Sequence, residues 1–212
     1  MYIAIEGVIG VGKTTLARLL QPMFEAELLL EIFEENPFLS DFYGDRVRYA
    51  FQTQIFFLLS RYHQQRRGVR EALGINPWLI SDYTFEKDRL FAEVNLAGDE
   101  LEMYFKVHEA LAEKITKPDL IVYLRADTDI LMQRIAQRDR PYERKMERSY
   151  IATLNDTYES LFTNYPSQKV LVINTNDLDF VRHTEDLDYV DHAIRQALKI
   201  APFQETLPID LK

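Results

Sequence analysis

The segment GVIGVGKTTL at residues 7–16 follows directly on the apolar run YIAIE at residues 2–6. It contains the pattern G-x-x-x-x-G-K-[ST], whose fixed positions are Gly7, Gly12, Lys13 and Thr14. Glycines let a backbone wrap around an anion with its N–H groups pointing inward, because no Cβ blocks the required dihedral angles. The segment therefore predicts a phosphate-binding loop between a strand and a helix, and with it an α/β fold.

The end of this loop concentrates positive charge. A helix that begins near Lys13 carries a partial positive charge at its N-terminus. Lys13 would supply a full charge to the β- and γ-phosphates, and the hydroxyl of Thr14 would bind Mg²⁺. The loop therefore indicates a nucleoside triphosphate, and it leaves open what the protein does with it.

The composition narrows the class of protein. The chain has 212 residues, of which 47% are hydrophobic and none is cysteine. This length suits a single α/β domain over residues 1–212, and the lack of cysteine excludes disulfides and thiolate metal sites and fits a cytoplasmic location. No apolar run reaches the roughly 18–20 residues of a membrane span. A net charge of −9 argues against a nucleic-acid partner.

Apolar stretches alternate with helical patterns along the chain. The predicted strands span residues 2–6, 28–32, 78–82, 119–124 and 169–174. The predicted helices span residues 13–24, 47–68, 84–96, 99–115, 128–138, 146–165 and 185–199, and the second of them is expected to end at Gly68. Because the strands are apolar throughout, we expect a five-stranded parallel sheet with helices on both faces.

Asp82 ends the third predicted strand, in the sequence LISD at residues 79–82. Open α/β sheets place ligand-facing residues at the carboxyl ends of their strands. An acid at this position can hold Mg²⁺, directly or through water. The alternative is that Asp82 caps the helix that follows it.

Positive charge gathers late in an acidic chain. Residues 134–148 hold six basic and three acidic residues, and Arg134 and Arg138 are one helical turn apart. With Arg140 they lie around a break between two predicted helices, which suits a lid over residues 138–146 that closes on a transferring phosphoryl group. The alternative is a solvated helix face, which is the favoured reading for Arg144, Lys145 and Arg148 taken singly.

The order of these motifs resembles one family over nearly the whole chain, the deoxynucleoside kinases, which transfer the γ-phosphate of ATP to the 5′-hydroxyl of a deoxynucleoside. The similarity is carried by GxxGxGKTT, EIFEENPFLSDFY, FQTQIFFLLSR, SDYTFEKDRLFAE and RIAQRDRPYE with SYIATLNDTYE. The combination of SDY with RDRPYERKME looks most like the bacterial deoxyguanosine kinase branch. This similarity implies a P-loop kinase fold with an arginine-rich lid, ATP as donor and Mg²⁺ as cofactor.

The resemblance also implies the residues of the two substrate sites. Glu31 would be the catalytic carboxylate beside the 5′-hydroxyl, with Lys13, Arg134, Arg138 and Arg140 around the transferred phosphate. Donor binding would use Gly7, Gly10, Gly12, Lys13, Thr14, Thr15, Arg138, Asp179 and Phe180. Acceptor binding would use Glu31, Tyr43, Gln54, Arg61, Asp82, Asp88 and Glu143, and the metal would lie at Thr14 and Asp82.

Elementary chemistry fits these roles. A glutamate of ordinary pKa cannot ionise a sugar hydroxyl in the ground state, but Glu31 need only orient it and accept its proton as the bond to phosphorus forms. Gln54 and Arg61 are seven residues apart, on one face of the long predicted helix. A glutamine can pair with a base edge through its donor and its acceptor, and Arg61 with Asp88 would form an ionic patch that favours bases with polar groups.

The chain departs from the family pattern after the third strand. Many members have Asp/Glu-Arg-Ser there, with the arginine near the 5′-hydroxyl, and this chain has Asp82, Tyr83 and Thr84. Tyrosine cannot supply that charge, so either another cation compensates or the hydroxyl is oriented differently.

The leading hypothesis is a purine deoxynucleoside kinase, with deoxyguanosine as the expected acceptor. Deoxyadenosine or a broad set of acceptors is the alternative. A nucleoside monophosphate kinase shares the loop and the lid but needs a basic pocket for the phosphate of its acceptor, and the sequence has no arginine near Glu31 to form one. A non-catalytic nucleotide-binding subunit is a further alternative. The resemblance implies a homodimer built through long helices.

Overall fold

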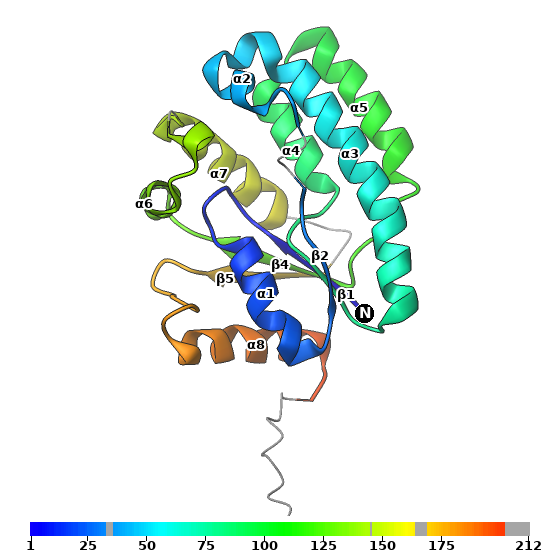
Figure 1. Ribbon diagram of the computed structural model, residues 1–212, viewed down its shortest axis with the longest axis vertical. Coiled ribbons are helices and arrows are strands. Elements are labelled where there is room, and N and C mark those ends of the chain that lie inside the picture. Colours follow the sequence, from blue (N-terminus) through cyan, green and yellow to red (C-terminus); the bar gives the residue numbers. More distant parts are fainter. Residues whose placement is uncertain (33–35, 145, 164–168, 202–212) are drawn as a thin grey trace, which may run out of the picture.

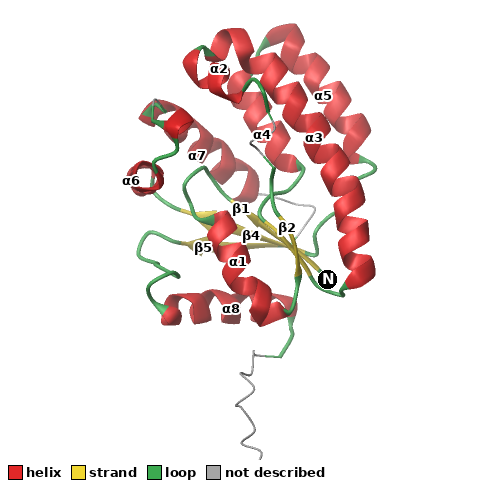
Figure 2. Ribbon diagram, viewed as in Figure 1, coloured by secondary structure: helices red, strands yellow, loops and turns green. Residues whose placement is uncertain are grey.

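Five parallel strands form one sheet in the order β2-β3-β1-β4-β5 (Figures 1 and 2). The computed structural model describes residues 1–32, 36–144, 146–163 and 169–201. The strands are β1 (Tyr2–Glu6), β2 (Glu27–Leu29), β3 (Leu79–Ser81), β4 (Leu120–Arg125) and β5 (Val170–Asn174). In the centre of the sheet Ile3 of β1 is in register with Ile80 of β3 on one side and with Leu120 of β4 on the other.

Helices cover both faces of this sheet, which confirms the predicted fold class. The helices are α1 (Lys13–Phe24), α2 (Leu39–Gly44), α3 (Arg46–Ile75), α4 (Glu86–Asn95), α5 (Gly98–Ala112), α6 (Thr128–Arg138), α7 (Arg148–Thr163) and α8 (Thr184–Leu198), with a short 3-10 turn η1 (Pro141–Glu143). Figure 1 shows α1 and α8 on one side of the sheet and α3, α4 and α7 on the other, with α5 packed outside α3 and α4. Among the described residues, no helix combines the length and the hydrophobicity that a membrane span requires.

The core lies on both sides of the central strands. Every residue of β1 is buried, and Leu16 and Leu20 of α1 pack against one face. A strand that is covered twice must be apolar at successive positions, which explains the uninterrupted hydrophobic runs in the sequence. Burial of these runs leaves the polar residues at the strand ends as the natural place for a site.

The long helix does not end where the sequence predicted. Helix α3 passes through Gly68 and ends at Ile75. A Cβ on residue 68 would lie 2.7 Å from Cδ1 of Leu29 in β2, so the glycine allows the helix and the strand to approach closely. Glycine near a predicted helix end was therefore a packing signal rather than a stop signal.

Two smaller elements also differ from the predictions. Strand β2 ends at Leu29 rather than at residue 32, so that Glu31 lies in the loop after the strand and not within its end. Residues 39–44 form the unpredicted helix α2. Between α6 and α7 the chain makes the turn η1, which lies within the segment 138–146 predicted as a lid. Lys145 of this segment lies outside the described residues, and so do residues 33–35 of the motif EIFEENPFLSDFY.

The loop after β1 has the backbone that its glycines allow. Gly7 has φ of 144° and Gly12, at the N-terminus of α1, has φ of 103°. Side chains other than hydrogen are strained in this region. At Gly7 an added Cβ would also overlap the backbone oxygen of Leu124, so two independent constraints require glycine there.

Candidate active site

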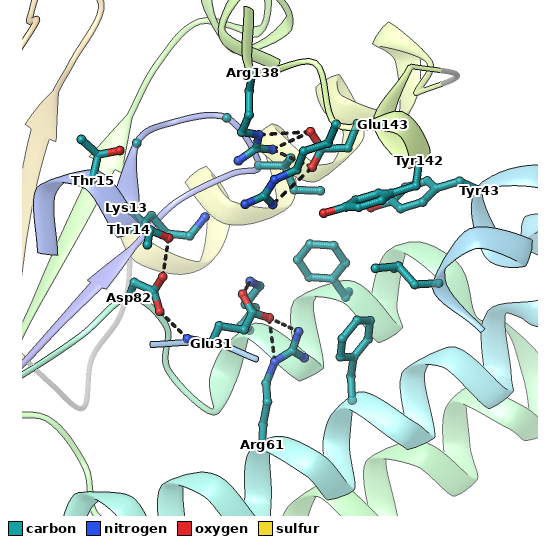
Figure 3. Close-up of a pocket in the computed structure, with 18 residues that line it drawn as sticks. Lys13, Thr14, Thr15, Glu31, Tyr43, Arg61, Asp82, Arg138, Tyr142 and Glu143 are labelled. Atoms are coloured by element: carbon teal, nitrogen blue, oxygen red, sulfur yellow. Dashed lines mark hydrogen bonds and ion pairs between the residues drawn. The ribbon is translucent and has the colours of Figure 1, made fainter. Parts of the chain in front are cut away.

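A cavity of about 290 Å³ opens at the carboxyl end of the sheet (Figure 3). The central strand β1 has β3 on one side and β4 on the other. Its residues come from the phosphate-binding loop, from the ends of β2 and β3, from α2, α3 and α4, and from the lid. They are Ile9, Gly10, Gly12, Lys13, Thr14, Thr15, Glu31, Leu39, Tyr43, Phe57, Arg61, Asp82, Lys87, Phe91, Arg138, Arg140, Tyr142 and Glu143.

The loop end of the cavity is cationic. The Nζ atom of Lys13 donates hydrogen bonds to the carbonyl oxygens of Gly7, at 2.7 Å, and Val8, at 3.2 Å. Burial and the charge of Lys87 lower the pKa of Lys13 to about 8, against the opposing effect of nearby carboxylates. A lysine held in this way can gain its full charge when an anion enters the loop.

The side chain of Asp82 joins this end of the cavity to the next. One carboxylate oxygen accepts a hydrogen bond from the hydroxyl of Thr14, and the other accepts one from the backbone N–H of Glu31 at 2.8 Å. Asp82 therefore fixes the loop after β2 against the first turn of α1. It lies beyond the last residue of β3, Ser81, where parallel sheets present polar groups to ligands.

Glu31 is partly buried, and it lies between two cations. Arg61 donates through Nε to Oε1 at 3.0 Å and also through Nη2, and Lys87 donates through Nζ to Oε2 at 2.5 Å (Figure 3 shows the Arg61 contact). Burial alone would raise the pKa of Glu31, but the charges of Lys87 and Arg61 hold it well below its usual range. Glu31 is therefore a carboxylate throughout the neutral pH range.

Helix α3 carries a polar row behind the cavity wall. Gln54, Phe57 and Arg61 lie on one buried face of the helix, and the guanidinium of Arg61 lies 4.4 Å from the ring centre of Phe57. Asp88, at the start of α4, accepts a hydrogen bond from Nη1 of Arg61. Among the described residues, Oε1 of Gln54 and Oδ2 of Asp88 have no hydrogen-bond partner.

Aromatic side chains form a slot beside these polar groups. Tyr43 of α2 and Tyr142 of η1 stack with their ring centres 6.0 Å apart and an interplanar angle of 17° (Figure 3). Phe57 and Phe91 line the same cavity from α3 and α4. A slot walled by flat rings is suited to a planar ligand such as a base.

The lid closes the third side of the cavity. Glu143 is 5% exposed and accepts hydrogen bonds from Nη2 of Arg138 at 2.6 and 2.8 Å and from Nε at 3.1 Å. Arg140 also approaches this carboxylate, at 3.7 Å. Two lid arginines are thereby directed into the cavity that holds Glu31 and Lys13.

A second cavity, of about 390 Å³, adjoins the outer side of the loop. Its lining includes Gly10, Gly12, Thr15, Arg134, Arg138, Asp179 and Phe180. Arg134 is directed away from Glu31, because its guanidinium donates to the hydroxyl and carbonyl oxygens of Thr175, at 3.0 and 2.6 Å, and to the carbonyl oxygen of Leu178. Of the three arginines that the sequence grouped together, Arg138 therefore lines both cavities, Arg134 lines the second and Arg140 lines the first.

Most predicted site residues meet in these two cavities. Gly10, Gly12, Lys13, Thr14, Thr15, Glu31, Tyr43, Arg61, Asp82, Arg138, Arg140 and Glu143 line the first, and Arg134, Asp179 and Phe180 line the second. Gly7 accepts a hydrogen bond from Lys13 through its carbonyl oxygen, and Gln54 and Asp88 are buried behind the residues that line the first cavity. The carboxylate at position 31 and the lysine at position 13 therefore face one space rather than opposite sides of the sheet.

The sequence did not single out Lys87, Phe91 or Tyr142, all of which line the first cavity. A usable signal for Lys87 was its place one residue before Asp88, in the first turn of a predicted helix where a cation is unfavourable. Tyr83, by contrast, is fully buried in a core cluster, and its hydroxyl donates to Oε1 of Gln64 at 2.5 Å.

The geometry matches phosphoryl transfer to a hydroxyl. An anion-binding loop and two lid arginines lie at one end of the cavity, and an ionised carboxylate lies at the other, beside a slot for a planar group. Catalysis of this reaction depends on alignment of the acceptor and on positive charge around the phosphoryl group.

Comparison with known proteins gives the same result. The chain matches the family model "Deoxynucleoside kinase" over residues 3–199. It is 38% identical to a deoxyguanosine kinase of Bacillus subtilis over 184 residues, which cover 85% of this chain and 89% of the relative, and 34% identical to a deoxyadenosine kinase of Dictyostelium discoideum over 185 residues, which cover 85% and 74%. A deoxyadenosine kinase from M. mycoides, solved with bound dCTP, superposes with a TM-score of 0.79 at 26% identity, covering 92% of this chain and all of that one. The chain therefore belongs to the deoxynucleoside kinase family, whose members use ATP as phosphate donor, and it is a phosphotransferase.

Proposed function

We propose that this kinase phosphorylates the 5′-hydroxyl of deoxyguanosine with ATP and Mg²⁺. The observation that carries the proposal is that Glu31 and Lys13 line one cavity together with the aromatic slot. The hydroxyl oxygen attacks the γ-phosphorus, the bond from phosphorus to the bridging oxygen of ADP breaks, and the hydroxyl proton passes to Glu31. The products are deoxyguanosine monophosphate and ADP.

The loop and the lid would supply the positive charge around the transferred phosphoryl group. Lys13, Arg138 and Arg140 converge on the cavity from opposite sides and would neutralise the phosphate oxygens as the transition state forms. Arg134, Asp179 and Phe180 line the adjoining cavity, which would take the adenine of the donor.

Thr14 and Asp82 offer two oxygen ligands that fit Mg²⁺. Their side chains already lie in hydrogen-bond contact at the mouth of the loop. Mg²⁺ is usually held by one or two protein oxygens, with phosphate oxygens and water completing its shell. When bound there, the ion would neutralise charge on the donor phosphates.

The preference for guanine is supported by the unpaired acceptors behind the slot. Asp88 Oδ2 and Gln54 Oε1 are buried oxygens without a hydrogen-bond partner among the described residues. The pairing edge of guanine presents two adjacent N–H donors, whereas that of adenine presents one donor beside an acceptor. A carboxylate therefore matches guanine better, because it accepts only.

The sugar is assigned to the other side of the slot. Tyr43 and Glu143 line the cavity near the lid, where a phenol and a carboxylate can share the 3′-hydroxyl. Burial, together with Tyr150, Glu143 and other nearby groups, raises the pKa of Tyr43 well above its ordinary value, so that its hydroxyl remains a donor.

A competition assay tests the proposal. Each of the four deoxynucleosides is offered with ATP and Mg²⁺, and deoxyguanosine is then offered against deoxyadenosine. We expect kcat/KM to be highest for deoxyguanosine. A higher value for deoxyadenosine would overturn the acceptor assignment, and phosphorylation of pyrimidines alone would overturn the purine assignment as well. Glu31→Gln should lower kcat by about 100-fold or more, because the proton acceptor is lost.

We further propose a homodimer that uses the outer faces of the long helices. Val47, Leu59 and Ile75 of α3 and Met103 of α5 are exposed apolar side chains. Sedimentation-equilibrium mass measurement tests this, with a monomer at micromolar concentration as the contradicting result.

A further inference from the structure

Lys87 is a buried cation whose position is unfavourable for the helix that carries it. It is the second residue of α4 and is 6% exposed. The first turn of a helix has a partial positive charge, so a lysine there lowers the stability of the helix. The removal of its ammonium group from water lowers the stability of the folded state further. A residue that opposes the charge preference of its own helix, without a gain in stability, is typical of a functional site.

The contact that Lys87 makes is to the proposed catalytic carboxylate. Its Nζ lies 2.5 Å from Oε2 of Glu31, whereas Arg61 binds Oε1. The two cations thus occupy different oxygens of one carboxylate. Arg61 is also bound to Asp88, so its charge is shared between two acids, while Lys87 has Glu31 as its salt-bridge partner.

The start of α4 is fixed, which makes Lys87 a rigid support. The backbone N–H and the hydroxyl of Thr84 donate to Oε1 of Glu6 at the end of β1, at 2.6 and 2.8 Å. The carbonyl oxygen of Phe85 lies 3.3 Å from Nε2 of His108 in α5. Anchors on both sides hold the first turn of α4 over the cavity.

We propose that Lys87 is a positioning residue for phosphoryl transfer: it fixes the orientation of Glu31, so that this carboxylate can receive the hydroxyl proton. The inference rests on the role proposed for Glu31 above. Tyr83, which follows Asp82 directly, cannot supply a cation beside Glu31. Lys87 supplies one from helix α4 instead.

The test compares Lys87→Met with Arg89→Met, which removes an exposed cation two residues further along the same helix. Arg89 pairs with Glu93 at the surface and should be replaceable. Lys87→Met should lower kcat by about 10- to 100-fold, the scale of general-base catalysis, with the KM of the deoxynucleoside changed by less than about threefold. Arg89→Met should leave both parameters as in the wild type.

Rescue by a second cation separates positioning from a structural role. Lys87→Arg keeps a cation beside Oε2 of Glu31 and should retain more of the wild-type kcat than Lys87→Met does. If Lys87→Met does not fold, as judged by circular dichroism, Lys87→Gln replaces it with the same expected loss of kcat. An unchanged kcat in the neutral variant, or a kcat that Lys87→Arg retains no better than Lys87→Met, would overturn the inference.

A double-variant cycle tests whether Lys87 acts through Glu31. In a Glu31→Gln background, Lys87→Met should reduce kcat by less than about threefold, because the group it positions is gone. Independent, multiplying effects would overturn the inference. If Glu31→Gln alone keeps wild-type kcat, the proposed role of Glu31 fails; if that variant is impaired and Lys87→Met is not, the inference about Lys87 fails by itself.

Discussion

Arg138 donates to both carboxylate oxygens of Glu143, with Nη2 2.6 Å from Oε1 and 2.8 Å from Oε2. These two residues are proposed to serve different substrates, Arg138 the donor phosphate and Glu143 the acceptor sugar. While they are bonded to each other, neither has its full hydrogen-bonding capacity for a ligand. The two binding events therefore meet at one ion pair, which is a physical route for coupling between them.

Glu143→Gln should weaken acceptor binding without weakening donor binding. The neutral amide is a poorer partner for a sugar hydroxyl, and hydrogen bonds to charged groups contribute about 1.5–3 kcal/mol, so the KM of deoxyguanosine should rise by about 10- to 100-fold. ATP affinity is measured by calorimetry without nucleoside. It should not fall, because the substitution releases Arg138 from its ion pair with Glu143. Glu147→Gln, at an exposed surface pair with Arg46, is the control and should change neither. A larger effect on ATP than on deoxyguanosine would contradict the assignment.

Asp88→Asn should erode the preference for guanine. In the proposed complex the substitution would set an N–H₂ donor, in place of one acceptor oxygen, opposite the donors of guanine. The ratio of kcat/KM for deoxyguanosine over deoxyadenosine should therefore fall by about 10-fold or more. The two acceptors are measured in parallel on one enzyme preparation. Asp99→Asn, exposed in the first turn of α5, is the matched control. An unchanged ratio would show that Asp88 does not read the base.

ATP binding should take up protons near pH 8. The pKa of Lys13 is lowered to about 8 by burial and by Lys87, and phosphates will raise it on binding. Near pH 8 about half of the free enzyme therefore has a neutral Lys13, and binding should take up about half a proton. The measurement is calorimetry in two buffers of different ionisation enthalpy. Lys13→Arg, which stays charged, should show no such uptake, and equal uptake in both proteins would assign the proton elsewhere.

Gly7→Ala and Gly74→Ala should change stability in opposite directions. At Gly7 the backbone has φ of 144° and a methyl group would overlap Leu124, so the free energy of unfolding should fall by about 1–3 kcal/mol. At Gly74, inside α3, a Cβ meets nothing within 4 Å, and alanine should raise the free energy of unfolding by about 0.5–1 kcal/mol. Urea unfolding monitored by circular dichroism measures both. A stable Gly7→Ala variant would contradict the close approach of β1 and β4 at this loop.

Local patterns in the sequence were sufficient for the fold. The phosphate-binding loop required a strand before it and a helix after it, and the uninterrupted apolar strands required helices on both faces. Element ends were less well determined. The sequence predicts a helix end at Gly68, but the role of this glycine depends on Leu29, a residue 39 positions earlier in the chain that no local pattern connects with it.

Local sequence patterns specified the chemistry that depends on backbone conformation, namely the loop around Lys13 and its place after β1, because glycine spacing and helix polarity act locally. Which charged side chains form ion pairs with one another depended on the tertiary structure. It placed Lys87 and Arg61, from two different helices, on the two oxygens of Glu31, and it bonded Arg134 of the second cavity to Thr175. Electrostatic partnership depends on distance in space and on burial, and a linear sequence specifies neither until the chain has folded.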